Sequence, residues 1–115
     1  MAKFLQVAPS FAARDVAALV AFYGRAMDLK PIYQSPEYAV LKRDDVELHI
    51  YPQRDGAVAG NNSAYFYVSG VDEIFERVKA EAKVIHEVGD KPYGLRDFLF
   101  ADPEGNKVGV AQTIE

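Results

Sequence analysis

The sequence contains no cysteine and no long apolar run, and both absences narrow the possible functions. Without cysteine, the chain has no disulfide, no thiolate metal site and no cysteine nucleophile. Small secreted domains often need disulfides, so their absence favours a cytoplasmic location. The apolar start of the chain is interrupted by Gln6 and Pro9 and does not match a signal peptide, and no segment approaches the length of a membrane span.

A concentration of positive charge is also missing. The 115 residues carry a formal net charge of −4, with acidic and basic side chains interspersed. A chain without a basic stripe is a poor candidate for binding nucleic acid, although its charge weakly favours cationic small molecules. The sequence has neither a Gly-x-Ser-x-Gly nucleophile motif nor a phosphate-binding glycine loop. Half of the residues are hydrophobic, which is typical of a single folded domain of this length.

The clearest positive pattern is an internal repeat. Apolar residues recur at i, i+3, i+4 and i+7 over residues 16–23, and the same spacing returns over residues 71–78. This spacing predicts two helices, each with one apolar face. Asp15 is expected to begin the first helix, whereas Ser69 and Asp72 indicate a capping box before the second.

Strand-like runs surround the two helices in the same order. One run precedes each helix, and a short strand and a hairpin follow it; the runs cover residues 5–13, 30–33, 38–42 and 46–51 in the first half and 64–68, 84–88, 98–101 and 107–111 in the second. A polar linker over 52–62 separates the halves. The order β-α-β-β-β, read twice, predicts an α+β fold of two βαβββ modules in one domain over 1–115, with repeats at about 1–55 and 62–115.

Several short segments, taken in order, resemble a known superfamily. They are residues 13–16 with 21–23, then 43–48, 71–73, 92–94 and the Asp-Pro-Glu-Gly-Asn turn at 102–106. Over nearly the whole chain they resemble the glyoxalase, bleomycin-resistance and extradiol-dioxygenase (vicinal oxygen chelate) superfamily, and in particular its bleomycin-resistance branch. The resemblance implies two βαβββ modules forming a curled mixed sheet and an open cleft, which agrees with the repeat.

The resemblance also implies where a metal would bind. The best-known activities of the superfamily use a divalent ion held by four side chains, and the matching positions here are Ala8, Glu47, Ser63 and Gly109. Only Glu47 is a competent ligand, because such ions need several oxygen or nitrogen donors. We therefore expect no metal and no cofactor at the family position. Glu47 and His49 lie on one strand face, so weak binding of a transition metal by this pair stays open.

Without a metal, the cleft is defined by its aromatic and polar side chains. Alternation along the strands places Glu47, His49 and Tyr51 on one face, and by the same alternation Ser63, Tyr65 and Tyr67 share a face. Tyr38 on the first hairpin and Tyr93 in a loop are added by their positions. The predicted ligand-binding residues are Tyr38, Glu47, His49, Tyr51, Ser63, Tyr65, Tyr67 and Tyr93. Tyrosines beside a carboxylate and an imidazole suit a flat, partly cationic ligand. The alternative is that these tyrosines only cap the core.

The bleomycin-resistance branch implies a protein that binds without chemistry. Its members sequester the antibiotic in clefts at the interface of a homodimer, often with an exchanged N-terminal arm, which here corresponds to residues 3–8. The chain departs from that branch in having no tryptophan, which leaves the identity of an aromatic or cationic ligand open. One alternative is a metal-dependent enzyme of the superfamily, a lyase, dioxygenase or thiol transferase, and another is an interaction domain with a vestigial cleft. We expect no catalytic residues and neither a nucleic-acid nor a membrane partner.

Overall fold

The computed structural model describes residues 1–114 and confirms the α+β fold of two βαβββ modules. The first module consists of β1 (Ser10–Ala13), α1 (Val16–Met27), β2 (Lys30–Ser35), β3 (Tyr38–Arg43) and β4 (Val46–Pro52). The second consists of β5 (Ser63–Tyr67), α2 (Val71–Lys79), β6 (Lys83–Asp90), β7 (Leu95–Ala101) and β8 (Lys107–Thr113). Within residues 1–114, neither α1 nor α2 is long and apolar enough to cross a membrane.

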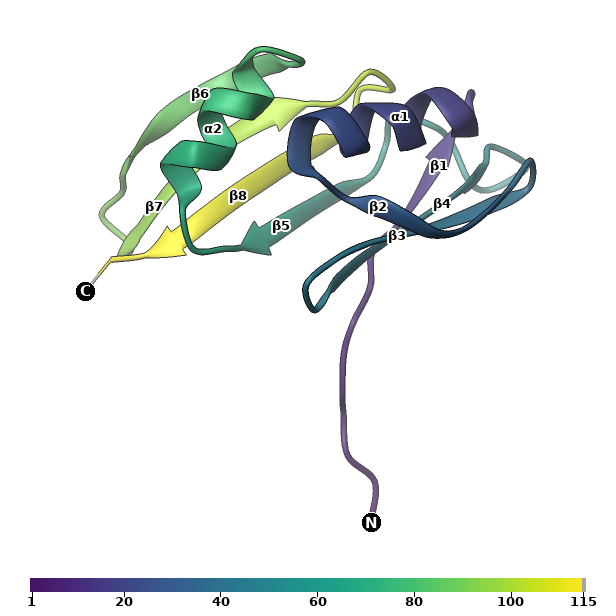
Figure 1. The fold of residues 1–115 in the computed structure, drawn as a ribbon, viewed down its shortest axis with the longest axis horizontal. Helices are drawn as coiled ribbons and strands as arrows, with labels where there is room; N and C mark the ends of the chain where they lie inside the picture. The colour runs from purple at the N-terminus through teal and green to yellow at the C-terminus, as the bar shows by residue number, and fades with distance from the viewer. Residues whose placement is uncertain (115) are drawn as a thin grey trace.

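Each module builds its own four-stranded mixed sheet. The strand orders are β1-β4-β3-β2 and β5-β8-β7-β6, with the first strand of each module parallel to its last and the other pairs antiparallel. Both helices lie on the same side of the sheets, and the sheets are not closed into a barrel (Figure 1). The opposite face of each sheet is therefore left open.

Strand alternation decides which side chains meet the helices. In β4, Leu48 and Ile50 are fully buried in the core, so Glu47, His49 and Tyr51 point to the open face. The same alternation in the second module buries an aromatic set that packs with the helices: Phe66, Phe98 and Phe100. The open faces consequently carry the polar and tyrosine side chains of both sheets.

The two helices begin in different ways. Asp15 caps α1 as predicted, accepting a 3.0 Å hydrogen bond from the Ala18 N–H through its side chain. The predicted capping box of α2 is wrong, because Gly70 takes the cap position with a φ of 76° and Ser69 lies one residue outside it. The side-chain oxygen of Gln112, from the end of β8, accepts the N–H groups of Gly70 at 2.8 Å and Val71 at 3.0 Å instead.

A buried carboxylate connects the modules. Asp102, only 5% exposed in the turn between β7 and β8, accepts the Tyr23 hydroxyl of α1 at 2.7 Å and the Asn106 side-chain amide at 2.9 Å. Asn106 in turn accepts the Asn62 N–H at 3.0 Å, and the Asn62 side chain accepts the Ala12 N–H of β1 at 3.1 Å. Burial, and then the charge of Asp102, raises the pKa of Tyr23 well above its ordinary value. The turn of the second module is thereby bonded to the helix and first strand of the other.

The opening strand is shorter than the predicted run over 5–13. Only Ser10–Ala13 pairs with β4, and the residues before it form an extended arm that runs away from the body (Figure 1). Among residues 1–114 the arm pairs with no strand, and Phe4, Leu5 and Val7 are 98%, 84% and 89% exposed. Its Gln6 side chain donates a 3.0 Å hydrogen bond to the Asp45 carbonyl at the β3–β4 turn.

We expect Asp102→Ala to lower the free energy of unfolding by about 3 kcal/mol or more, because it leaves several buried donors without an acceptor. Urea denaturation measures the change. Asp55→Ala is the control, since Asp55 is exposed and its loss should change the free energy of unfolding by less than about 0.5 kcal/mol. Equal urea midpoints for the two variants would show that the Asp102 network does not stabilise the fold.

Candidate functional site

Three of the predicted residues form a hydrogen-bonded chain on the open face of the first sheet. His49 Nε2 lies 3.1 Å from a carboxylate oxygen of Glu47, and His49 Nδ1 is bonded to the Tyr38 hydroxyl. A neutral imidazole with its proton on Nε2 satisfies both bonds, with Tyr38 donating to Nδ1 and Nε2 donating to Glu47. Both ring nitrogens are therefore engaged, so a metal on the Glu47–His49 pair would have to displace one of these bonds.

Two other predicted residues lie apart from this chain. The Arg54 guanidinium sits 5.1 Å from the centre of the Tyr51 ring, so a cation of the protein already occupies that position on the ring. Ser63 is exposed at the start of β5, where it pairs with Lys107 of β8.

The open face of the second sheet is organised by a carboxylate that the sequence did not single out. Asp97 of β7 is only 7% exposed, and one of its oxygens accepts the hydroxyls of Tyr65 and Tyr93, each at 2.6 Å. Its other oxygen accepts Lys91 Nζ at 2.6 Å. The Tyr67 ring packs edge-on against Tyr65, with centres 5.3 Å apart. We call Tyr65, Tyr67 and Tyr93 the tyrosine wall.

The protonation equilibria follow from these contacts. Burial would raise the pKa of Asp97, but the hydrogen bonds from Lys91, Tyr65 and Tyr93 outweigh it and lower the pKa below the ordinary value. Burial and the bond to Asp97 raise the pKa of Tyr65, and the same bond is the main reason that the pKa of Tyr93 is raised. The cluster thus holds an ionised carboxylate and two neutral phenols over a wide pH range.

The residues at the family metal position do not fit a metal ion. A side chain at Gly109 would begin 2.3 Å from Cδ1 of Tyr65, so the Tyr65 ring fills the space that a ligand at this position would need. Ala8 has no donor atom, and Ser63 is a weak ligand. Within residues 1–114, no group of three or more histidine, aspartate or glutamate side chains is arranged to hold a metal.

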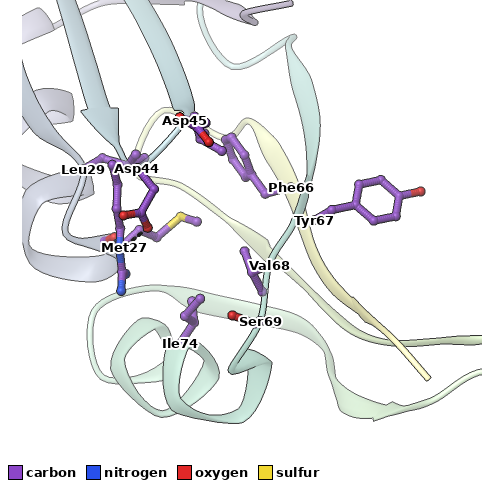
Figure 2. A pocket seen from close by; sticks show the side chains of 11 residues that line it. Met27, Leu29, Asp44, Asp45, Phe66, Tyr67, Val68, Ser69 and Ile74 are labelled. Carbon is purple, nitrogen blue, oxygen red and sulfur yellow. Dashed lines mark hydrogen bonds and ion pairs between the residues drawn. The ribbon is translucent and has the colours of Figure 1, made fainter. Parts of the chain in front are cut away.

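Two of the pockets on the described surface are each lined by at least one predicted site residue. The smaller, of about 240 Å3, is lined by the tyrosine-wall residues Tyr65 and Tyr93 together with Asp97, Lys91 and His86, among others. The larger, of about 320 Å3, lies between the modules and is lined mainly by apolar side chains with Asp44 and Asp45 at its edge (Figure 2).

Of the predicted residues, only Tyr67 borders the larger pocket, and its ring points away from the other lining side chains (Figure 2). The structure therefore groups most predicted site residues into two clusters, one on each sheet. Neither pocket is lined by residues of both clusters. The sequence analysis did not identify Asp97 or Lys91 as site residues. The available signal was Asp97 itself, a charged residue next to Phe98 within a strand.

We expect Asp97→Asn to lower the pKa values of Tyr65 and Tyr93, because the phenols lose their charged acceptor, while the part of the Tyr65 shift that burial causes stays. In the parent, the raised pKa values mean that these bonds stabilise the fold fully below about pH 10 and are lost as the pH rises through the folded-state pKa. Spectrophotometric titration of the tyrosines measures the shift. Tyr33→Phe on β2 is the control. If Tyr65 and Tyr93 titrate as late in Asp97→Asn as in the parent, the assignment is wrong.

The chain matches a family model described as the Glyoxalase/Bleomycin resistance protein/Dioxygenase superfamily over residues 3–110. The bleomycin resistance protein of Geobacillus stearothermophilus is 24% identical over 131 residues, covering 96% of this chain and 98% of that protein.

Solved structures agree with this match. The bleomycin-binding protein of Streptomyces verticillus, in complex with copper(II)-bleomycin, is 30% identical to this chain with a TM-score of 0.80. The match covers 100% of this chain and 99% of that protein. A lactoylglutathione lyase from Agrobacterium tumefaciens shares the fold alone, at 23% identity and a TM-score of 0.79, with 96% and 95% of the two chains covered. With its paired βαβββ modules and a family match over most of its length, the chain belongs to the Glyoxalase/Bleomycin resistance protein/Dioxygenase superfamily.

Proposed function

We propose that this chain is a non-catalytic binding protein that sequesters an aromatic or cationic small molecule of the bleomycin type. One observation carries the proposal. At the position where the superfamily holds a metal, the Tyr65 ring lies against Gly109, and Tyr67 and Tyr93 extend the surface beside it. The three rings are 42%, 64% and 62% exposed, which is unusual for large aromatic side chains that only complete a core.

The chemistry of the open faces supports a flat ligand with positive charge. Aromatic rings stack on other rings and attract cations over their faces, which contributes about 0.5–2 kcal/mol for each contact. Glu47 provides a carboxylate on the other sheet, where its side chain is 23% exposed. The bleomycin-binding protein of Streptomyces verticillus has the same fold over the whole chain, and the bleomycin resistance protein of Geobacillus stearothermophilus aligns with 96% of it.

We further propose that the complete cleft requires a second copy of the chain. We call the hydrogen-bonded residues Tyr38, Glu47 and His49 the Glu47 cluster. This cluster and the tyrosine wall lie on separate sheets, and no hydrogen bond within the described residues links them. A homodimer that brings the first sheet of one copy opposite the second sheet of its partner would unite them. The exposed apolar arm supports this arrangement, because burial of Phe4, Leu5 and Val7 would favour association.

We expect Tyr65→Ala and Tyr93→Ala to weaken binding of bleomycin by about 2 kcal/mol, roughly thirtyfold, because each removes a ring from the binding surface. Isothermal titration calorimetry measures the affinities. Tyr33→Ala is the matched control, since Tyr33 is an exposed tyrosine on β2, away from the tyrosine wall.

The outcomes separate the possible functions. If the parent binds bleomycin and neither substitution weakens it, the ligand lies elsewhere. If the parent binds no drug of this type, antibiotic sequestration is wrong for this chain. About one zinc, iron, manganese or nickel ion for each chain, lost on Glu47→Ala, would instead favour a metal-dependent enzyme of the superfamily.

Light scattering is expected to give the mass of two chains for the full-length protein. Deletion of residues 1–8 should weaken association at least about tenfold, because the apolar arm no longer contributes buried area. A full-length protein that stays monomeric at all concentrations would refute the dimer, and an unchanged dissociation constant after the deletion would refute the role of the arm.

A further inference from the structure

The cluster around Asp97 uses all its hydrogen-bond donors internally. Lys91 has three N–H donors, and its Nζ lies within hydrogen-bond distance of the Gly89 carbonyl, the Asp97 carbonyl and the Asp97 side chain, at 3.4, 3.1 and 2.6 Å. Tyr65 and Tyr93 each have a single O–H, and both donate to Asp97. The Lys91 charge is also balanced by that of Asp97. A ligand beside Lys91, Tyr65 and Tyr93 therefore meets aromatic rings and phenolic oxygens, but no free donor from these three side chains and no net positive charge.

The Tyr65 ring is fixed at two points. Its edge at Cδ1 lies against Gly109, where even a methyl group would clash with the ring, and its hydroxyl is held by the buried Asp97. Tyr93, in the loop that joins β6 to β7, is held at its hydroxyl by the same carboxylate oxygen. A ring held at its hydroxyl and along one edge has lost much of its rotational freedom before a ligand arrives, so binding does not have to order it.

We propose that Asp97 is a positioning residue that holds Tyr65 and Tyr93 as fixed ring faces, and that the resulting wall selects flat neutral or cationic rings and rejects anionic ones. The inference rests on the proposed function, since it assigns a ligand preference to the same tyrosine wall. Asp97 offers the ligand no free donor and acts through the two tyrosines. The charge of a ring then decides whether this half of the site accepts it.

The preference follows from electrostatics. The face of a phenol ring carries the negative end of its quadrupole, which attracts cations and repels anions. An anionic ligand usually requires a lysine or arginine donor, and Lys91 already has its three acceptors within the protein. His86, the other titratable side chain lining this pocket, is exposed, and the test is made at about pH 8.

The first measurement needs no ligand. The chain has seven tyrosines and no tryptophan, so its near-ultraviolet circular dichroism reports mainly on tyrosine environments. We expect Asp97→Asn to reduce this signal while the far-ultraviolet spectrum stays unchanged. Asp55→Asn changes the net charge equally at an exposed position and should leave both spectra as in the parent.

The second measurement compares benzamidine and benzoate, which have the same ring and opposite charges, by nuclear magnetic resonance titration of the tyrosine rings. The parent should bind benzamidine, and benzoate should shift no tyrosine resonance at the same concentration. Asp97→Asn should weaken benzamidine and bleomycin about tenfold, because the rings become mobile. The double variant Tyr65→Phe with Tyr93→Phe keeps both rings, removes their anchors and should weaken both ligands similarly. It thereby keeps the test decisive if Asp97→Asn folds poorly.

The two proposals fail in different ways. Equal binding of benzoate and benzamidine, or of bleomycin by the parent and the unanchored variants, would overturn the inference while leaving sequestration intact. Parent-like circular dichroism in a folded Asp97→Asn would also overturn it. A parent that binds benzamidine selectively but not bleomycin would refute antibiotic sequestration and support the wall. A parent that binds neither would refute both.

Discussion

The arrangement of the molecule depends on the burial of one ionised group, the carboxylate of Asp102. A carboxylate removed from water is destabilising unless its oxygens are bonded, and here the donors come from the turn itself, from Asn106 and from Tyr23 of the other module. Satisfying that charge therefore requires α1 to lie beside the turn between β7 and β8. The relative orientation of the two open faces follows from this requirement, and with it the positions of the Glu47 cluster and the tyrosine wall.

Asp97 is a second buried carboxylate that orients the side chains bonded to it. Where Asp102 joins modules, Asp97 gathers side chains of one sheet, and its hydrogen bonds run to rings that face solvent. In this respect Asp97 resembles the metal ion of the superfamily's metal-binding members, because a metal ion also orients several side chains around one charge. In this chain, a buried carboxylate and Lys91 organise the second sheet, and the space next to Gly109 holds a ring.

The sequence predicted features that are determined locally. Helical spacing identified both helices, and strand alternation placed Glu47 with His49 on one face. Features that need distant partners were not predictable in this way. The start of α2 is bonded to Gln112, which lies 42 residues beyond Gly70, and so the nearby Ser69 was chosen instead. Likewise, alternation put Tyr65 on the open face but could not show that Asp97, 32 residues further along, holds its hydroxyl.

The long separations in the network that joins the modules also bear on how the protein is made. The N–H of Asp15 at the start of α1 is bonded to Glu104, and Tyr23 to Asp102, across 89 and 79 residues. A ribosome synthesises the first module well before these partners exist, so its helix cannot obtain them during most of translation. Contacts of such high sequence separation also form late and slowly after release, because a long loop must close first. The sheet of the first module can cover the apolar face of α1 as soon as β4 is made, whereas Tyr23 and the N–H of Asp15 lack their partners until the β7–β8 turn has been synthesised.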